Sequence, residues 1–437
     1  MKNLYVSTLK EKLNEEIEFQ GFVDKIRNLQ YVMFIILRDK TGKVQVTIEK
    51  NDANKELLAS ISNLTVESTV KVFGRLLESP NVKLNGMEII PKRIVITSLS
   101  KQELPFDYKS RDNSLRETRL DYRFLDLRRD ENRLLFACQT FIEAKMREYW
   151  IQNDFMEIHT PKITAKAAES GAETFKLDYF GQEAELAQSP QFYKQMTMAS
   201  GFDKVFEIGP VYRAENSHTS YHASEILMID SEISWIDSVD DVMDSEEAWI
   251  KYFMRALKEE YGEKIKETFH VEVSDVTNPF PRINFYEAKK IIQEQFHYIG
   301  EQKEDFDRHE EELISKYAKD KYKSDFVFIT NYPYSARSFY VMKDENGITQ
   351  TYDLIFKGVE ITSGAQREHR PEILKKQIQE KGINPETLKF YTDFFEYGCP
   401  PHGGYGVGLA RIMMRIFEID NIREATLIYR GPTRLNP

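Results

Sequence analysis

A chain of 437 residues, with 41% apolar residues and a formal net charge of −11, is large enough for two or three domains. No stretch approaches the roughly 18 consecutive apolar residues of a membrane span, and the N-terminus lacks the apolar segment of a secretory signal. The two cysteines, Cys138 and Cys399, are too few for a zinc cluster or a disulfide framework. We therefore predict a cytoplasmic protein without a membrane partner, and any metal should be a hard cation on oxygen ligands.

The charge is unevenly distributed along the chain. Residues 1–104 carry 16 Lys and Arg against 13 Asp and Glu, a net charge of +3, and the remainder carries 44 against 58, a net charge of −14. An acidic protein can still bind RNA through a local basic surface. Charge alone therefore does not exclude RNA as a partner.

Residues 1–104 are predicted to form a small β-barrel. A helix, Asn51–Ser62, is expected between its third and fourth strands. This order is typical of the OB fold, a common binder of single-stranded nucleic acid, although a barrel without that function has the same pattern. Phe34 and Gln45 lie on adjacent strands, where one can stack on a base and the other can hydrogen-bond its edge. The five predicted strands are Glu18–Val23, Val32–Arg38, Val44–Ile48, Thr69–Leu76 and Glu88–Ile96.

A polar linker or hinge is predicted at 105–130, followed by an α+β domain over 131–437. This domain begins with an amphipathic helix, Asn132–Trp150, and a strand at Phe155–Ile158. An antiparallel hairpin is expected over 204–236, and a charged helical segment follows at about 239–325. Strand patterns then return at Asp325–Asn331, Phe339–Met342 and Thr351–Phe356. We expect a largely antiparallel sheet flanked by helices.

Charged residues accumulate in the predicted hairpin. Arg213 and Glu215 lie on its first arm, and Glu225, Asp230 and Glu232 lie on its second. These are too many charges for strands this apolar unless they line a site. The hairpin therefore predicts one wall of a polar site.

The segment Phe356–Arg370, FKGVEITSGAQREHR, predicts a second wall. As a strand it would carry Glu360 and Thr362 on one face. The alternation breaks at Ser363–Ala365, where small residues allow the backbone to approach a ligand, and Arg367 follows. This combination of polar groups suits a metal–phosphate group beside a carboxylate substrate. An edge strand with a solvated polar face is the alternative.

Glycines are concentrated near the C-terminus, at Gly404, Gly406 and Gly408. Only 34 residues remain from Gly404 to Pro437, which is too short for a dinucleotide-binding fold. We expect the glycines to open a helix with Arg411 one turn inside it, which is an arrangement that can bind an anion.

Three ordered segments resemble the motifs of class II aminoacyl-tRNA synthetases: Asn153–Thr164, Val211–Ile233 and Gly403–Arg411. The stretches AQSPQFYKQ and DLIFKGVEITSGAQREHR look like those of aspartyl-tRNA synthetases of the archaeal and eukaryotic type. The resemblance covers essentially the whole chain. It implies an OB-fold anticodon-binding domain, a class II catalytic domain and a homodimer. The implied reaction is ATP-dependent activation of L-aspartate to aspartyl-adenylate and transfer to tRNA(Asp), with tRNA(Asn) as a second candidate acceptor.

The resemblance also implies roles for single residues, with Arg213 and Arg411 as the catalytic arginines. Aspartate would be bound by Glu169, Gln191, Lys194, Asp230, Ser363 and Arg367. ATP would be bound by Arg213, Glu215, His222, Glu225, Glu360, Gly408 and Arg411. Mg²⁺ would be held by Asp353, Glu360 and Ser363. The anticodon would be read by Phe34, Gln45 and Glu88.

Four residues depart from the family's usual motifs, and all four lie in the segments expected around ATP. They are Tyr221, Ile226, Ala410 and Gly431. Two alternatives to an aspartate–tRNA ligase follow from these departures. One is a paralogue that binds tRNA without aminoacylating it, and the other is an enzyme that passes aspartate to an acceptor other than tRNA.

Overall fold

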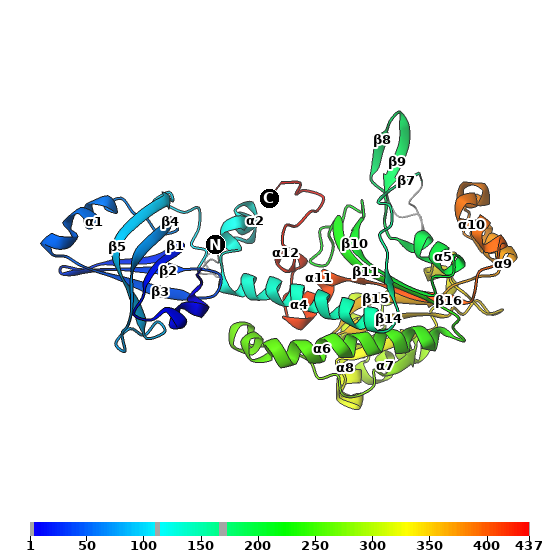
Figure 1. Cartoon of the computed structure of the whole chain (residues 1–437). Coiled ribbons are helices and arrows are strands. Elements are labelled where there is room, and N and C mark those ends of the chain that lie inside the picture. The colour runs from blue at the N-terminus through cyan, green and yellow to red at the C-terminus, as the bar shows by residue number, and fades with distance from the viewer. Residues whose placement is uncertain (1–3, 110–113, 166–172, 437) are drawn as a thin grey trace. The chain divides into compact units, whose positions relative to one another are not determined.

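The structure is a computed structural model that describes residues 4–109, 114–165 and 173–436. The chain divides into two compact units, Met1–Thr118 and Arg119–Pro437 (Figure 1). Glu169, predicted to bind aspartate, lies outside the described residues. None of the helices in these ranges is both long enough and apolar enough to cross a membrane.

The N-terminal unit is a closed five-stranded barrel in the order β1-β2-β3-β5-β4. The OB fold predicted from the sequence is therefore confirmed. Alternating residues of its strands fill the interior, including Phe19, Leu37 and Val46. The helix predicted at Asn51–Ser62 is divided into a 3₁₀ turn, Asp52–Asn54, and α1, Lys55–Ser60. The strands are β1 Glu16–Asn28, β2 Val32–Arg38, β3 Lys43–Glu49, β4 Thr69–Glu78 and β5 Met87–Ser98.

The C-terminal unit is built on an eight-stranded sheet in the order β12-β13-β14-β15-β16-β11-β10-β6. The described neighbours are antiparallel except at the two ends, where β12 pairs with β13 and β10 with β6 in parallel. The predicted α+β layout is therefore confirmed. The strands are β6 Met156–Glu157, β10 Lys204–Tyr212, β11 Glu225–Ser234, β12 Arg282–Asn284, β13 Phe326–Thr330, β14 Thr351–Phe356, β15 Val359–Gln366 and β16 His402–Gly408.

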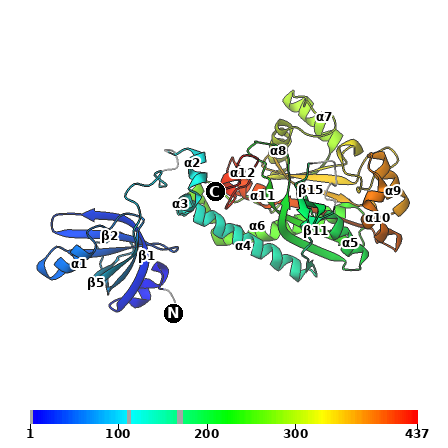
Figure 2. The ribbon, with the colours of Figure 1, turned by 90° about the horizontal axis from the view of Figure 1, so that it is seen from above.

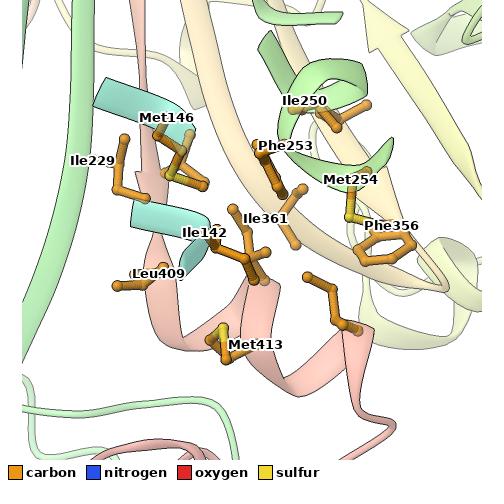
Figure 3. Packing of buried hydrophobic residues seen from close by; sticks show 14 of the residues in the cluster. Ile142, Met146, Ile229, Ile250, Phe253, Met254, Phe356, Ile361, Leu409 and Met413 are labelled. Atoms are coloured by element: carbon orange, nitrogen blue, oxygen red, sulfur yellow. The ribbon is translucent and has the colours of Figure 1, made fainter. Parts of the chain in front are cut away.

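Two long helices, α4 Asp130–Gln152 and α6 Val239–Phe269, pack against each other and against the sheet. Figure 3 shows Met146 of α4, Phe253 of α6 and Ile361 of β15 meeting in one apolar cluster with α11, Leu409–Ile416. A smaller sheet, β7 Ile163–Thr164, β8 Lys176–Tyr179 and β9 Gln182–Leu186, carries a hairpin that projects from this unit in Figure 1.

The remaining helices cover the edges of this unit. α5 Gln191–Ala199 shares a hydrophobic cluster with α9 Pro371–Glu380 and α10 Lys389–Glu396, and Figure 2 shows α9 and α10 together at one end of this unit. The others are α2 Arg116–Asp121, α3 Arg123–Asp126, α7 Phe285–Phe296, α8 Arg308–Tyr322 and α12 Ile422–Ala425. α2 and α3 thus fall inside the predicted linker 105–130, whose exact bounds stay a prediction.

Three predictions of local structure are wrong. The helical segment 239–325 contains a strand, β12, because Ile283 is buried beside β13. Phe339–Met342 forms no strand and contributes a single bridge, between Val341 and Arg367. The glycines do not open a helix but lie on β16, and α11 begins directly after Gly408.

The face assignment on β15 is also wrong, because this strand contains a bulge. Ile355 pairs with Glu360 and Leu354 pairs with Thr362, so Ile361 is an extra residue. Thr362 is consequently buried on the core face, opposite Leu354 and Val407. The strand does not break at Ser363 but continues to Gln366. Glu360, before the bulge, and Ser363, after it, lie together on the opposite face of the strand.

Candidate functional site

The polar residues of four strands form one row across the sheet. Asp230 of β11 pairs with Gly406 of β16, Gly406 with Ser363 of β15, and Ser363 with Asp353 of β14. Residues directly opposite in an antiparallel sheet point to the same face. The register therefore brings the predicted aspartate-binding residue Asp230 and the predicted metal ligands Asp353 and Ser363 onto one surface.

The glycines of β16 form the open floor of this surface. A Cβ atom at Gly404 would lie 2.2 Å from Oε2 of Glu232, and one at Gly406 would lie 3.1 Å from Oδ1 of Asp230. The acidic side chains of β11 thus lean over the neighbouring strand and occupy the space that other residues would fill. This close approach, and not a helix start, explains the glycine repeat.

Above this floor lies a cavity of about 290 Å³. Four of the predicted aspartate-binding residues and two of the predicted ATP-binding residues line it together with Gly406 and Tyr340. The four are Gln191, Asp230, Ser363 and Arg367, and the two are Arg213 and Glu215. Arg213 and Glu215 follow β10 and are not part of it, since that strand ends at Tyr212.

Arg367 is fixed at one end of the cavity by Glu232. Its Nε and Nη2 atoms donate to the two carboxylate oxygens of Glu232 at 2.8 and 3.2 Å, and both side chains are buried. Nη1 makes no hydrogen bond to any described residue. Because Arg367 lines the cavity, this free edge of the guanidinium is available to a ligand there.

Lys194, predicted to assist Arg367 in binding aspartate, is not among the residues that line the cavity. It is fully buried beside the acidic residues of β11, where its Nζ lies 2.9 Å from Asp230 and 3.4 Å from Glu232 and donates to the Tyr405 carbonyl at 3.1 Å. Burial raises the pKa of Asp230 in spite of Lys194. Burial alone would raise the pKa of Glu232 as well, but the charges of Arg367 and Lys194 outweigh burial and hold this pKa below its ordinary value. Lys194 therefore acts on the cavity through these two carboxylates.

Glu360, predicted to bind both ATP and metal, lies beside Arg411. Nη1 of Arg411 donates to the Glu360 carbonyl at 3.0 Å and lies 3.9 Å from its carboxylate. Burial and the Asp353 carboxylate raise the pKa of Glu360 to about 6. Glu311 of α8 accepts the Glu360 amide at 3.0 Å, and burial together with Glu360 raises its pKa to about 7. Burial is the larger cause of both raised pKa values, and the neighbouring carboxylate adds to it.

The donors at Asp353, Glu360 and Ser363 are all oxygen atoms, which fits a hard cation such as Mg²⁺. Within the described ranges, no group of three or more His, Cys, Asp or Glu side chains is arranged to hold a metal. The predicted set of Mg²⁺ ligands contains only two residues of these types, Asp353 and Glu360, because its third member is the hydroxyl of Ser363.

The remaining predicted ATP-binding residues lie on the loop after β10 and at the ends of β11 and β16. Arg213 is held by its backbone amide, which donates to the Ser224 carbonyl at 2.9 Å. Burial and the nearby Arg411 lower the pKa of His222. Glu225 is the exposed first residue of β11, and Gly408 precedes α11.

The four departures from the family pattern have ordinary surroundings. The Tyr221 ring lies 4.6 Å below the guanidinium of Arg308, which also donates to its hydroxyl. Ile226 and Ala410 pack against the core. A Cβ atom at Gly431 would lie 2.2 Å from the Tyr429 hydroxyl, so glycine suits that position.

Sequence reasoning missed Arg337 and placed Glu232 at the site without a specific role. Glu232 carried a usable signal, because it lies two residues after Asp230 and therefore on the same face of the strand. Arg337 carried none, since it follows a 3₁₀ turn, Tyr334–Ala336, in an irregular loop. It nevertheless bonds Asp353 and lines the cavity.

A groove of about 1160 Å³ lies on the barrel. Its lining includes Phe34, Gln45 and Glu88, as predicted for an RNA reader. Glu88 accepts hydrogen bonds from Thr47 and, at 3.3 Å, from Nε2 of Gln45. Five basic residues line the groove against three acidic ones, which favours a polyanion. The basic residues are Lys25, Arg27, Lys43, Lys50 and Lys83, and the acidic ones are Asp24, Glu49 and Glu88.

Residues 115–429 match the family described as tRNA synthetases class II (D, K and N). The chain belongs to this family of class II tRNA synthetases. Residues 17–97 of this synthetase match the OB-fold nucleic acid binding domain.

The synthetase has full-length relatives with known names. It is 41% identical over 443 residues to the aspartate–tRNA(Asp) ligase of Pyrococcus abyssi, with 100% of both chains covered. It is 39% identical over 438 residues to the aspartate–tRNA(Asp/Asn) ligase of Methanopyrus kandleri, again with 100% of both covered. Among solved structures, the aspartyl tRNA synthetase of Entamoeba histolytica is 30% identical with a TM-score of 0.88, over 100% of this chain and 93% of that one.

Proposed function

We propose that the protein is an aspartate–tRNA ligase, which activates L-aspartate with ATP and transfers it to the 3′ end of tRNA(Asp). The observation that carries this proposal is the fixed guanidinium of Arg367, whose free edge faces a small cavity next to Arg213 and Asp230. Two relatives of full length that are about 40% identical act, by name, on aspartate and tRNA.

The cavity suits the two ends of aspartate. Arg367 offers a planar fork to the β-carboxylate, a geometry that lysine cannot provide. Asparagine would instead turn the NH₂ group of its amide toward the guanidinium donors, so a site built for a carboxylate disfavours it. Asp230 and Gln191 line the same cavity and can accept hydrogen bonds from the α-ammonium group.

Adenylation needs no protein nucleophile, because the α-carboxylate of aspartate attacks the α-phosphorus of ATP directly. The protein therefore contributes positioning and charge neutralisation. We assign Arg213 to the α-phosphate and the substrate carboxylate, and Arg411 to the γ-phosphate. Asp353, Glu360 and Ser363 would hold Mg²⁺, which neutralises phosphate charge when it is bound. The terminal adenosine hydroxyl of tRNA then attacks the activated carbonyl.

The decisive experiment is aspartate-dependent ATP–pyrophosphate exchange with purified protein and Mg²⁺. We expect exchange with aspartate and not with asparagine, and its loss in Arg213→Ala and Arg367→Ala. Arg370→Ala is the matched control, because Arg370 pairs with Glu368 and does not line the cavity. Normal exchange in both cavity variants would refute the proposal. A protein that binds tRNA tightly without any exchange would be the non-aminoacylating paralogue, and aspartyl-adenylate without aminoacyl-tRNA would indicate another acceptor.

Two further features are part of the proposal. We expect a homodimer, and the first family motif together with the end of the preceding helix α4 offers an apolar surface for it: Ile151, Met156 and Ile163 are more than 45% exposed. Light scattering at micromolar concentration tests this expectation.

Whether tRNA(Asn) is also charged is tested with purified transcripts of both tRNAs, since one relative is named for tRNA(Asp) and another for tRNA(Asp/Asn). The cytoplasmic location remains a prediction.

A further inference from the structure

Arg337 occupies the position between two of the predicted metal ligands. Its Nη1 and Nη2 atoms donate to the two carboxylate oxygens of Asp353 at 3.0 and 2.6 Å. Nη1 also donates to the hydroxyl of Ser363 at 3.3 Å. Asp353 and Ser363 are directly opposite each other on β14 and β15, so a single guanidinium bridges both strands.

The surroundings of Arg337 hold it in this position. Its guanidinium carbon lies 3.8 Å from the centroid of the Tyr332 ring, and its side chain is only 12% exposed. Tyr332 is itself buried and supports the flat face of the guanidinium. Nε of Arg337 is buried without a hydrogen-bond partner among the described residues. The position is therefore stabilised by charge and stacking, but its hydrogen bonding is incomplete.

A divalent cation and this guanidinium compete for the space between the same two oxygen ligands. Mg²⁺ requires oxygen ligands at about 2.0–2.1 Å in near-octahedral geometry. The Arg337 nitrogen that lies 3.0 Å from Asp353 and 3.3 Å from Ser363 fills the space where a bridging cation would lie. A cation that bound both oxygens at this point would have to displace that nitrogen.

The nearby charges indicate what would release Arg337. Asp353 and Asp305 face it as carboxylates, and Glu360 lies on the same side of β15. Arg411 is engaged with Glu360, since its Nη1 atom donates to the Glu360 carbonyl and lies 3.9 Å from the Glu360 carboxylate. If Arg337 moves away from Asp353, it needs another anion, and a phosphate group accepts two parallel hydrogen bonds from a guanidinium. Arg337 also lines the cavity, where such a group can reach it.

We propose that Arg337 is a resident counter-ion of the ligand-free site, which a divalent cation displaces from Asp353 and Ser363 when a phosphate group is present to receive the guanidinium. This inference rests on the proposed function and adds a consequence to it. Metal and nucleotide bind cooperatively, and the cation site stays closed until the nucleotide arrives. Arg337 is thus a positioning residue that sets the order of binding.

The test is to titrate the full-length protein with Mn²⁺ in the absence of nucleotide. The electron paramagnetic resonance signal of free Mn²⁺ measures how much of the ion is bound. We expect weak binding to the wild type and binding at least about tenfold tighter in Arg337→Met, because the ion no longer has to break the charged hydrogen bonds between Arg337 and Asp353. Arg337→Lys keeps a cation and should bind Mn²⁺ as weakly as the wild type. The control Arg370→Met removes an arginine that does not line the cavity and should change nothing.

Two results would overturn the inference: Arg337→Met binding Mn²⁺ no tighter than the wild type, or the tighter binding surviving in Arg337→Met/Asp353→Asn. A melting curve with and without Mn²⁺ gives a second readout, and only the Arg337→Met protein should gain thermal stability from the ion alone. If Arg337→Met does not fold, Arg337→Gln replaces it. None of these measurements requires aspartate or tRNA. A wild-type protein without pyrophosphate exchange would refute the proposed function and leave the Mn²⁺ result to be judged separately.

Discussion

The cavity of the catalytic unit holds its charges in fixed buried pairs, whereas the barrel groove exposes much of its polar lining to solvent. Arg367, Glu232 and Lys194 are each 5% exposed or less in their side chains. In the groove, Tyr31 is 75% exposed and Phe34 is half-buried. The cavity measures about 290 Å³ and the groove about 1160 Å³.

This difference follows from the two ligands that we propose. Aspartate is small and differs from its amide by one charge, so the charges that recognise it must be fixed before it binds. RNA is large and flexible, and its bases can be recognised by stacking and by a few hydrogen bonds. Substitutions in the cavity should therefore affect both stability and adenylation, while substitutions in the groove should affect RNA binding alone.

The largest expected effect is that of Glu232→Gln, which tests whether the cavity depends on buried charge pairs. The substitution keeps the size of the side chain but leaves Arg367 without its anion. Breaking a buried pair in this way costs about 3–5 kcal/mol. We expect the free energy of unfolding to fall by about this amount in denaturant titration, and aspartate-dependent exchange to fall at least about 100-fold as Arg367 loses its position.

The matched control for this variant is Glu183→Gln on the β8–β9 hairpin. Glu183 pairs with Lys176, and both side chains are at least 60% exposed. Exposed pairs contribute about 0–1 kcal/mol, so this variant should keep wild-type stability and exchange. Equal effects of the two substitutions would contradict the distinction between cavity and surface charges.

The second prediction concerns a buried acid behind the cavity floor. Glu246 of α6 accepts a hydrogen bond of 2.6 Å from the Tyr352 hydroxyl, and the Tyr352 ring packs directly against Gly364. Burial raises the pKa of Glu246 to about 8, an effect that the Tyr352 hydrogen bond only reduces. The folded protein therefore keeps this proton between pH 4.5 and 8, where the unfolded chain releases it. Stability should fall as the pH rises through this window, by about 1.4 kcal/mol per pH unit.

Glu246→Gln removes that titration and should lessen the dependence of stability on pH. Between pH 6 and pH 8, the unfolding free energy of the variant should rise relative to wild type by about 2–3 kcal/mol, at about 1.4 kcal/mol per pH unit. Glu259→Gln, exposed on the same helix, is the control. Parallel curves for wild type and Glu246→Gln would show that the buried acid is already ionised at neutral pH.

The groove and the cavity also differ in how far the sequence predicts them. Strand alternation located all five barrel strands, four of them to within two residues at each end, because each strand has one face in the interior. The first strand, β1, extends five residues beyond its predicted C-terminal end. Phe34 and Gln45 could be placed on one surface from strand order alone. No long-range charge pair was needed for that step.

The cavity could be predicted only in part. The charged residues of the hairpin and of Phe356–Arg370 indicated a site, but three features depend on tertiary structure. The bulge at Ile361 reverses the face of Thr362, and β16 takes the glycines into the sheet. Arg337 reaches Asp353 from an irregular loop that carries no periodic signal. Register and loop position are set by contacts between distant segments, which local patterns do not contain.

The third prediction tests the independence of the groove. Phe34→Ala removes a ring that can stack on a base, and stacking contributes about 1–3 kcal/mol per base. We expect the Kd for tRNA to rise about 5- to 150-fold while pyrophosphate exchange without tRNA stays unchanged. Phe73→Ala is the control, because Phe73 does not line the groove and instead packs under Arg93 at 4.0 Å. A loss of exchange in Phe34→Ala would show that the two sites are not separable.

The smallest effect is expected for Glu88→Gln. This substitution tests a part of the groove where hydrogen bonds between side chains fix a polar group, as they do in the cavity. Glu88 accepts hydrogen bonds from Thr47 and Gln45, so it determines which way the Gln45 amide turns. A glutamine at position 88 can donate as well as accept and allows the amide of Gln45 to turn over. Losing this orientation should cost about 1 kcal/mol, the contribution of one hydrogen bond, in the preference between tRNA(Asp) and tRNA(Asn) transcripts. The overall affinity for RNA should hardly change, because the five basic residues of the groove remain. If both transcripts lost affinity equally and strongly, Glu88 would support the barrel and would not orient a reader of the bases.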